Sequence, residues 1–154
     1  MRFRGRSTHT LDAKGRLSIP ARFREVLKQR YGNATLIMTN TPECLYVYPW
    51  PEWQELEEKL LSSPVDPPEL RLYKRYFLGS AEECQPDRQG RILIPNHLRQ
   101  EVGIEREVVL VGMLNYFEIW SPQRLEAEFQ RVRENFTELS ASVANLLNGE
   151  RTQA

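Results

Sequence analysis

Two stretches of ten residues, LDAKGRLSIP from Leu11 to Pro20 and PDRQGRILIP from Pro86 to Pro95, share five identical positions. Every shared residue recurs 75 positions later along the chain. The matched pairs are Asp12 and Asp87, Gly15 and Gly90, Arg16 and Arg91, Ile19 and Ile94, and Pro20 and Pro95. A fixed period in a sequence is the signature of repeated structural units. The 154-residue chain is therefore predicted to contain two copies of one small module.

The flanks of the two motifs predict the same order of elements in each half: strand, tight turn, strand, short helix, strand, strand and helix. Pro20 and Pro95 each suit the first turn of a helix, where a missing N–H costs nothing. Apolar residues then recur at helical spacing until Gly32 and Gly103. Apolar runs predict strands at 34–39, 44–49, 107–113 and 116–121, and helical spacing returns at 51–61 and 122–136.

A proline-rich segment separates the two halves. Ser62–Pro68 contains three prolines in seven residues and cannot continue a helix. Leu70, Tyr73 and Phe77 then follow at helical spacing. We therefore expect an α+β protein with a first module at 1–62, a proline-broken linker and connecting helix at 63–77, and a second module with the C-terminal helix at 78–154.

The motif has the residues of a tight turn with a charged exit. Asp12 can accept hydrogen bonds from turn amides, and Gly15 supplies the positive φ that a tight turn needs. Arg16 follows as the chain leaves the turn. An Asp–Arg pair across the turn can be a purely structural staple. A guanidinium has five N–H donors, however, so one edge can hold Asp12 while the other contacts a partner. The same alternatives apply to Asp87, Gly90 and Arg91 in the second copy, and in both copies we expect Asp and Gly to be structural.

The charges are segregated along the chain although the net charge is zero. Residues 1–30 contain nine Lys or Arg and only two acids, a net charge of +7 (9 − 2), which leaves −7 for the remainder. A basic cluster beside the first motif is typical of a site for a polyanion. On charge alone, a solvated basic face balanced by acidic neighbours is an equally good interpretation.

Several classes of protein are disfavoured. No apolar run reaches the length of a membrane span, and the basic N-terminus lacks the apolar stretch of a secretory signal, so we expect a cytoplasmic protein that does not bind membranes. Cys44 and Cys84 have no CxxC pattern, which predicts free thiols and no metal site. No nucleophile–base pair or glycine-rich phosphate loop is present in the sequence. We therefore expect no enzymatic activity, no cofactor and no small-molecule substrate.

The combined segments FRGRSTHTLDAKGRLSIPARFRE, YPWPEW, LGSAEEC and VVLVGMLNYFEIWSP resemble the MraZ family over nearly the whole chain. The resemblance implies two tandem AbrB-like swapped-hairpin β-barrel modules in a chain that assembles into homo-oligomeric rings. It also implies a nucleoid-associated bacterial transcriptional regulator of the division and cell-wall gene cluster. Such a regulator binds direct repeats in its own promoter, as double-stranded DNA, and generally represses it. The alternative that remains open is a protein-assembly or antitoxin-like interaction module of the same fold.

This interpretation assigns different contacts to different basic residues. Arg16 and Lys14 at the turn are expected to reach guanine edges in the major groove. Phosphate contacts are expected from Arg2, Arg4, Arg6, Arg22 and Arg24. For Arg22 and Arg24, the solvated face of a helix is an equally good interpretation. Arg91 is expected to be the weaker contact, because the second motif lacks a basic segment before it.

Overall fold

The computed structural model describes the backbone of residues 1–153 and the side chains of residues 1–149. The chain divides into two compact units, Met1–Pro122 and Gln123–Ala154, and each is considered by itself. In chain order the elements are β1 (Arg6–Thr10), β2 (Arg16–Ser18), α1 (Ala21–Tyr31), β3 (Leu36–Asn40), β4 (Leu45–Pro49), α2 (Trp50–Leu61), α3 (Pro68–Tyr73), η1 (Lys74–Leu78), β5 (Glu82–Cys84), β6 (Arg91–Leu93), α4 (Asn96–Glu101), β7 (Glu107–Gly112), β8 (Phe117–Trp120) and α5 (Pro122–Gln153).

The order of elements predicted for each half is confirmed. The predicted strand at 34–39 is β3, and the predicted helix at 51–61 is α2, with shifts of one or two residues at their ends. Helix α1 begins directly after Pro20 and buries Phe23 and Leu27. The connecting helix differs in one respect: α3 passes into a π-helical turn, η1, whose end is closed by a hydrogen bond from the Gly79 amide to the Lys74 carbonyl.

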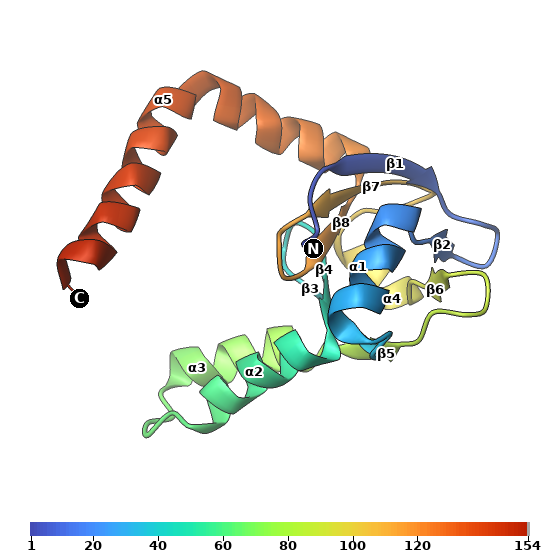
Figure 1. The fold of residues 1–154 in the computed structure, drawn as a ribbon, viewed down its shortest axis with the longest axis horizontal. Coiled ribbons are helices and arrows are strands. Elements are labelled where there is room, and N and C mark those ends of the chain that lie inside the picture. Colours follow the sequence, from blue (N-terminus) through green and yellow to red (C-terminus); the bar gives the residue numbers. More distant parts are fainter. Residues whose placement is uncertain (154) are drawn as a thin grey trace. The chain divides into compact units, whose positions relative to one another are not determined.

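The two halves are interleaved in one antiparallel sheet of six strands, with the order β1-β7-β8-β4-β3-β5 (Figure 1). Strand β1 of the first half pairs with β7 of the second, so that Thr8 lies opposite Val109. Strand β5 of the second half pairs with β3 of the first, and β4 pairs with β8 at the centre. Each half thus supplies an edge strand to the other.

The observed strand pairing differs from the two separate barrel modules that the resemblance implied. Among the strands that the structure describes, none closes into a barrel. Strands β2 and β6 form a separate two-stranded sheet in which Leu17 lies opposite Ile92. The two strands that flank each turn therefore pair with the other half and not with each other. A module of about 60 residues has little interior of its own, and exchanging strands lets both halves share one core.

The shared core contains residues from both halves. Leu17, Phe23 and Leu36 of the first half lie in one buried cluster with Ile92 and Leu98 of the second. A second, smaller cluster joins Ile37, Trp53 and Phe77, where α2 and η1 cover one face of the sheet. The boundaries at 62 and 78 remain a prediction about sequence modules, since the packing joins the two halves.

Helix α5 bends at Asn135, whose φ of −130° and ψ of 24° are not helical. Beyond this kink an apolar stripe is exposed, made of Phe136, Leu139, Val143, Leu146 and Leu147. In the described part of the chain, no helix combines the length and the apolar character that crossing a membrane requires.

Candidate nucleic-acid interface

The two motifs form turns with matching backbone geometry. Gly15 and Gly90 have φ values of 83° and 75°, a region that favours glycine. In the first turn the Gly15 amide donates to the Asp12 carbonyl at 3.0 Å, and the Asp12 amide donates to the Arg16 carbonyl at 3.0 Å. The corresponding bonds of the second turn are 3.0 and 2.9 Å long. The repeat in the sequence is therefore also a repeat in hydrogen bonding.

Each aspartate holds its turn through both oxygens. Oδ1 of Asp12 accepts from the amides of Lys14 and Arg16, each at 2.9 Å. Its Oδ2 accepts from Nε of Arg16 at 2.6 Å. Because the Arg16 amide, the Arg16 side chain and the Lys14 amide all favour the charged carboxylate, they lower the pKa of Asp12 to about 2 against the opposing effect of burial. Lys14 itself is exposed at the tip of the turn.

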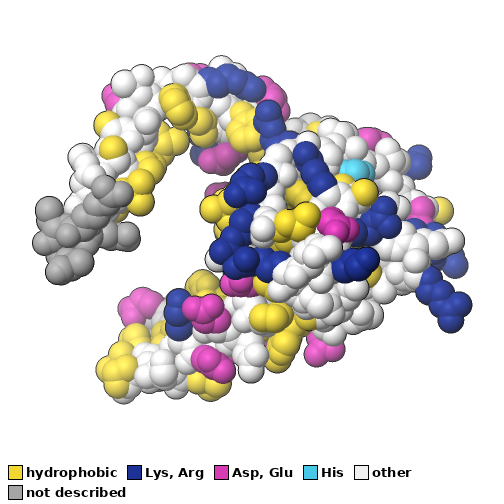
Figure 2. Space-filling model, viewed as in Figure 1, with side chains coloured by type: hydrophobic (Ala, Val, Ile, Leu, Met, Phe, Trp, Pro, Cys, Tyr) yellow, Lys and Arg dark blue, Asp and Glu magenta, His cyan; other side chains and the backbone are white. Residues whose placement is uncertain are grey.

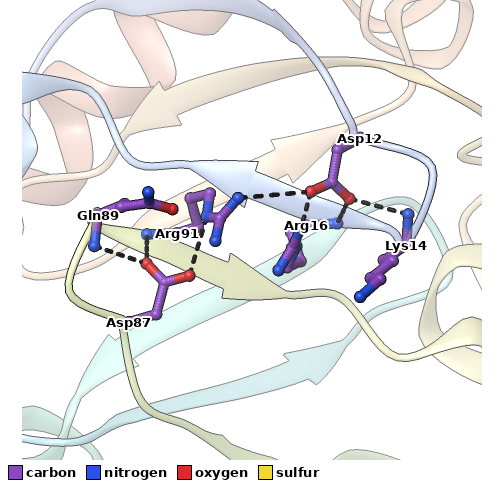
Figure 3. A network of polar contacts seen from close by, with 6 residues as sticks. All are labelled: Asp12, Lys14, Arg16, Asp87, Gln89 and Arg91. Carbon is purple, nitrogen blue, oxygen red and sulfur yellow. Dashed lines mark hydrogen bonds and ion pairs between the residues drawn. The ribbon is translucent and has the colours of Figure 1, made fainter.

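The second turn repeats these bonds. Asp87 accepts from the amides of Gln89 and Arg91, each at 2.9 Å, and from Nε of Arg91 at 2.9 Å. The Arg91 amide is the largest cause that lowers the pKa of Asp87. The pairing of β2 with β6 brings both turns together, so Asp12, Arg16, Asp87 and Arg91 form one cluster, here called the paired motif site (Figure 3).

One contact joins the two motifs across this site. Nη1 of Arg91 lies 4.0 Å from Oδ2 of Asp12, and Figure 3 shows Arg91 between the two carboxylates. The side chains of Arg16 and Arg91 are 30% and 28% exposed. Their Nε atoms donate hydrogen bonds to the aspartates. Each guanidinium has further N–H donors on its two terminal nitrogens. The site thus combines a structural staple with partly accessible positive charge.

The other predicted contacts are distributed over two regions. Arg2, Arg4, Arg6 and Arg22 belong to the N-terminal segment and α1, and are here called the N-terminal basic group. Nη2 of Arg22 donates to the Arg6 carbonyl at 3.1 Å, which ties α1 to the start of β1. Nη1 of Arg2 donates to Oδ1 of Asn115, and Arg4 is exposed. Figure 2 shows Lys and Arg side chains over the face that carries α1 and the N-terminal segment, and again where the loops beside β2 and β6 project.

Arg24, also expected to contact phosphate, is exposed on α1 and makes a contact across the two halves. Its side chain packs on Gly90 of the second turn: a Cβ atom at Gly90 would come within 2.6 Å of Cδ of Arg24. Arg99, which was not among the residues predicted from the sequence, covers Gly15 in the same way. Arg99 stands 75 residues after Arg24, so the period of the motif could have identified it.

Within the described residues, the structure shows neither a metal-binding cluster nor a reactive thiol. No group of three or more His, Cys, Asp or Glu side chains there is arranged to hold a metal ion. Cys44 and Cys84 are buried free thiols, as predicted, and burial raises the pKa of Cys84 to about 12. A thiol that stays protonated at neutral pH is a weak nucleophile.

These features define a tandem-repeat α+β protein in which two Asp-x-x-x-Arg turns meet in one site. The family model for "MraZ protein, putative antitoxin-like" matches residues 2–76 and again residues 77–146. The chain belongs to the MraZ family, which confirms the resemblance found in the sequence.

Relatives extend over almost the whole chain. It is 45% identical over 142 residues to the transcriptional regulator MraZ of Syntrophobacter fumaroxidans, covering 92% of this chain and 94% of the relative. It is 45% identical over 147 residues to the protein of that name from Desulforapulum autotrophicum, covering 94% and 98%. The protein of that name from Desulfitobacterium hafniense is 43% identical over 145 residues, covering 94% and 98%.

Proposed function

We propose that this protein is a transcriptional regulator that binds double-stranded DNA through the paired motif site and the N-terminal basic group. The observation that carries the proposal is the meeting of two arginine turns in one site, the first of which belongs to the segment 1–30 of net charge +7. The names of the relatives support the same role. Nothing in this assignment requires a catalytic group or a cofactor.

The two regions suit different kinds of contact. Lys14 is exposed at the first turn, and Arg16 is fixed beside it by Asp12, so both are suited to guanine edges in the major groove. The N-terminal basic group is suited to phosphates, which position a protein on DNA without reading its sequence. Arg91 is the second base contact and the weaker one, because its guanidinium is also drawn toward Asp12. Arg24 packs on Gly90 through its aliphatic part and is exposed, so we keep it as a proposed phosphate contact.

Assembly raises the affinity of a small basic site. A few phosphate contacts give weak, salt-sensitive binding, whereas several copies on one assembly make later contacts intramolecular. We propose a homo-oligomeric ring that engages direct repeats in the promoter of its own gene, in the division and cell-wall gene cluster, and represses it. Such a role would associate the protein with the nucleoid. The exposed apolar stripe of α5 supplies a surface for contact between copies.

The test is a footprint of the purified full chain on the DNA upstream of its own gene, repeated across a salt series. We expect protection of regularly spaced direct repeats that is lost steeply as the salt concentration rises. Protection without a repeating pattern, or equal protection of scrambled DNA of the same length, would exclude sequence-specific regulation by this chain.

A second candidate is an antitoxin-like interaction module, which the description of the family model favours. In that case the paired motif site would bind an acidic protein partner. Purification from cells with and without nuclease treatment separates the two candidates. A partner that stays bound in stoichiometric amount after the DNA is removed supports the antitoxin-like module, and its absence together with a positive footprint supports the regulator.

A further inference from the structure

Each motif turn is covered by an arginine from the other half of the chain. Arg99, on α4 of the second half, lies on Gly15 of the first turn, where a Cβ atom would come within 2.8 Å of both its Cζ and its Nη1. Arg24, on α1 of the first half, lies on Gly90 of the second turn, where a Cβ atom would come within 2.6 Å of its Cδ. Real Cβ atoms essentially never come closer than 3.0 Å to other heavy atoms, so a larger residue at either position would require the covering arginine to shift.

The backbone repeats this crossed arrangement. The Ile94 amide, in the second half, donates to the Gly15 carbonyl at 3.0 Å. The Ile19 amide, in the first half, donates to the Gly90 carbonyl at 2.9 Å. Each turn glycine is therefore contacted by the opposite half in two ways: its carbonyl accepts a hydrogen bond, and an arginine side chain covers the side where a Cβ atom would lie. Glycine is needed at Gly15 and Gly90 for this close approach as well as for the positive φ.

The contact made by Arg99 is packing and not a hydrogen bond to the turn. Its Nε is buried and has no hydrogen-bond partner within the part of the chain that the structure describes. A buried N–H donor without an acceptor destabilises the fold. We therefore expect the Arg99 guanidinium to have another role that offsets this cost. A planar guanidinium packs well against a flat peptide unit, which a lysine ammonium does not.

We propose that Arg99 and Arg24 are positioning residues that act across the two halves. Arg99 fixes the first turn and thereby the direction of Lys14 and Arg16, while Arg24 fixes the second turn and Arg91. This inference rests on the proposed DNA binding for its consequence, although the clamp itself is independent of DNA. Recognition by the first motif then depends on a residue of the second half that does not touch DNA.

The first experiment measures the clamp in the absence of DNA. Backbone amide exchange is followed by NMR in the full chain at residues 12–18 and 87–93, for the original protein and for Arg99→Ala and Arg24→Ala. Local opening controls the exchange of such amides. We expect Arg99→Ala to speed exchange at residues 12–18 by about fivefold or more, and at residues 87–93 by less than about twofold. Arg24→Ala is expected to show the reverse pattern.

The control is Lys59→Ala, which removes one positive charge from α2, where the side chain is 75% exposed and paired with Glu55 at 3.7 Å. It should leave both segments unchanged. If Arg99→Ala leaves exchange at residues 12–18 unchanged, or speeds it equally in both turns, the crossed clamp is refuted. Thermal melting of each variant shows whether a uniform increase comes from global destabilisation.

The second experiment measures binding to a duplex of the DNA upstream of the gene and to a scrambled duplex of the same length. Arg99→Ala should weaken promoter binding by about tenfold, in the lower part of the range for one arginine–base contact, with less than about twofold change for scrambled DNA. Its salt dependence should stay as steep as in the original protein, since no phosphate contact is lost. A uniform loss with a shallower salt slope would make Arg99 a phosphate contact and overturn the inference.

The two experiments separate the inference from the proposed function. If the original protein does not prefer the promoter duplex, the proposed function fails, and the exchange pattern still decides whether the clamp exists. If the protein prefers the promoter and Arg99→Ala preserves that preference, the positioning role is wrong while the function stands.

Discussion

Arg91 of the second motif bonds its own Asp87 at 2.9 Å and also places Nη1 4.0 Å from Oδ2 of Asp12 in the first motif. Asp12 thus faces two guanidiniums, whereas Asp87 faces one in the described structure. The two motifs, identical in pattern, are unequal in their electrostatics. We therefore expect Asp12 to contribute more than Asp87 to the stability of the paired motif site.

Replacing the two aspartates should have unequal effects. Asp12→Ala removes the acceptor of two turn amides and of Arg16, and also the carboxylate near Arg91. Asp87→Ala removes the corresponding bonds of one turn only. We expect both to lower the melting temperature and Asp12→Ala to lower it more. Parallel calorimetry of the two variants provides the comparison, and an equal or larger loss for Asp87→Ala would contradict it.

The pH dependence of stability follows from the lowered pKa of Asp12. Its pKa of about 2 lies below the ordinary aspartate value of 3.8, so between these pH values the native state binds fewer protons than the unfolded state. The stabilisation is fully present above about pH 4 and is lost as the pH falls through about 2. Carboxyl chemical shifts should show Asp12 titrating near pH 2. In Asp12→Asn, stability should depend less steeply on pH in this range, and an unchanged slope would exclude Asp12 as its source.

Gly15→Ala should lower the free energy of unfolding more than Gly32→Ala does. Both glycines have positive φ, 83° and 58°, so alanine is strained at either position, by an amount on the order of 1–3 kcal/mol. A Cβ atom at Gly32 meets nothing within 4 Å, whereas at Gly15 it would come within 2.8 Å of Cζ of Arg99 and displace that side chain from the turn. Urea unfolding should therefore show a larger loss for Gly15→Ala. The excess should shrink when Arg99→Ala is also present, and additive losses would show that the contact carries no energy.

Replacing Arg16 and replacing Arg4 should change DNA binding in different ways. Arg16→Ala should cost about 1–3 kcal/mol of specific affinity and relax the preference for the promoter, because it removes a base contact. Arg4→Ala should weaken promoter and scrambled duplexes alike and reduce the salt slope by about 1, because it removes a phosphate contact. Band-shift titrations at several salt concentrations, with the oligomeric state checked by light scattering, measure both effects. Unchanged retardation of the promoter by Arg16→Ala would remove Arg16 from the site.

The sequence predicted the local elements well because their signals are local. Pro20 and the apolar spacing after it define α1, and Gly15 and Gly90 mark the turns. The sequence did not allow us to predict which strands pair with each other. The alternation that buries Leu17 is satisfied by any antiparallel neighbour, and its pairing with Ile92 depends on packing of the whole chain.

The contact between Arg24 and Gly90 could not be predicted for the same reason. On α1 alone Arg24 occupies an exposed position, which suggests a phosphate contact or a solvated face. Its contact with Gly90 exists only because β2 and β6 pair across the halves. The offset of 75 residues relates Arg24 to Arg99, but it does not show what either side chain contacts.

The apolar stripe of α5 should be required for assembly. Leu139 and Val143 are each 45% exposed at its centre, and burying such side chains between copies is favourable by roughly 25 cal/mol for each Å² of apolar surface. The variant Leu139→Glu/Val143→Glu places two charges in the stripe and should reduce the oligomer to smaller species, as measured by light scattering.

The control is Asn145→Glu, which adds a charge to the exposed opposite side of the same helix and should leave the assembly intact. Because a ring increases affinity through multivalency, the dissociated variant should also lose promoter affinity by on the order of 10²-fold, while each copy keeps its preference for promoter over scrambled DNA. A double variant that remains fully assembled would place the contact between copies on another surface. One that dissociates without losing affinity would show that a single copy is sufficient to bind the promoter.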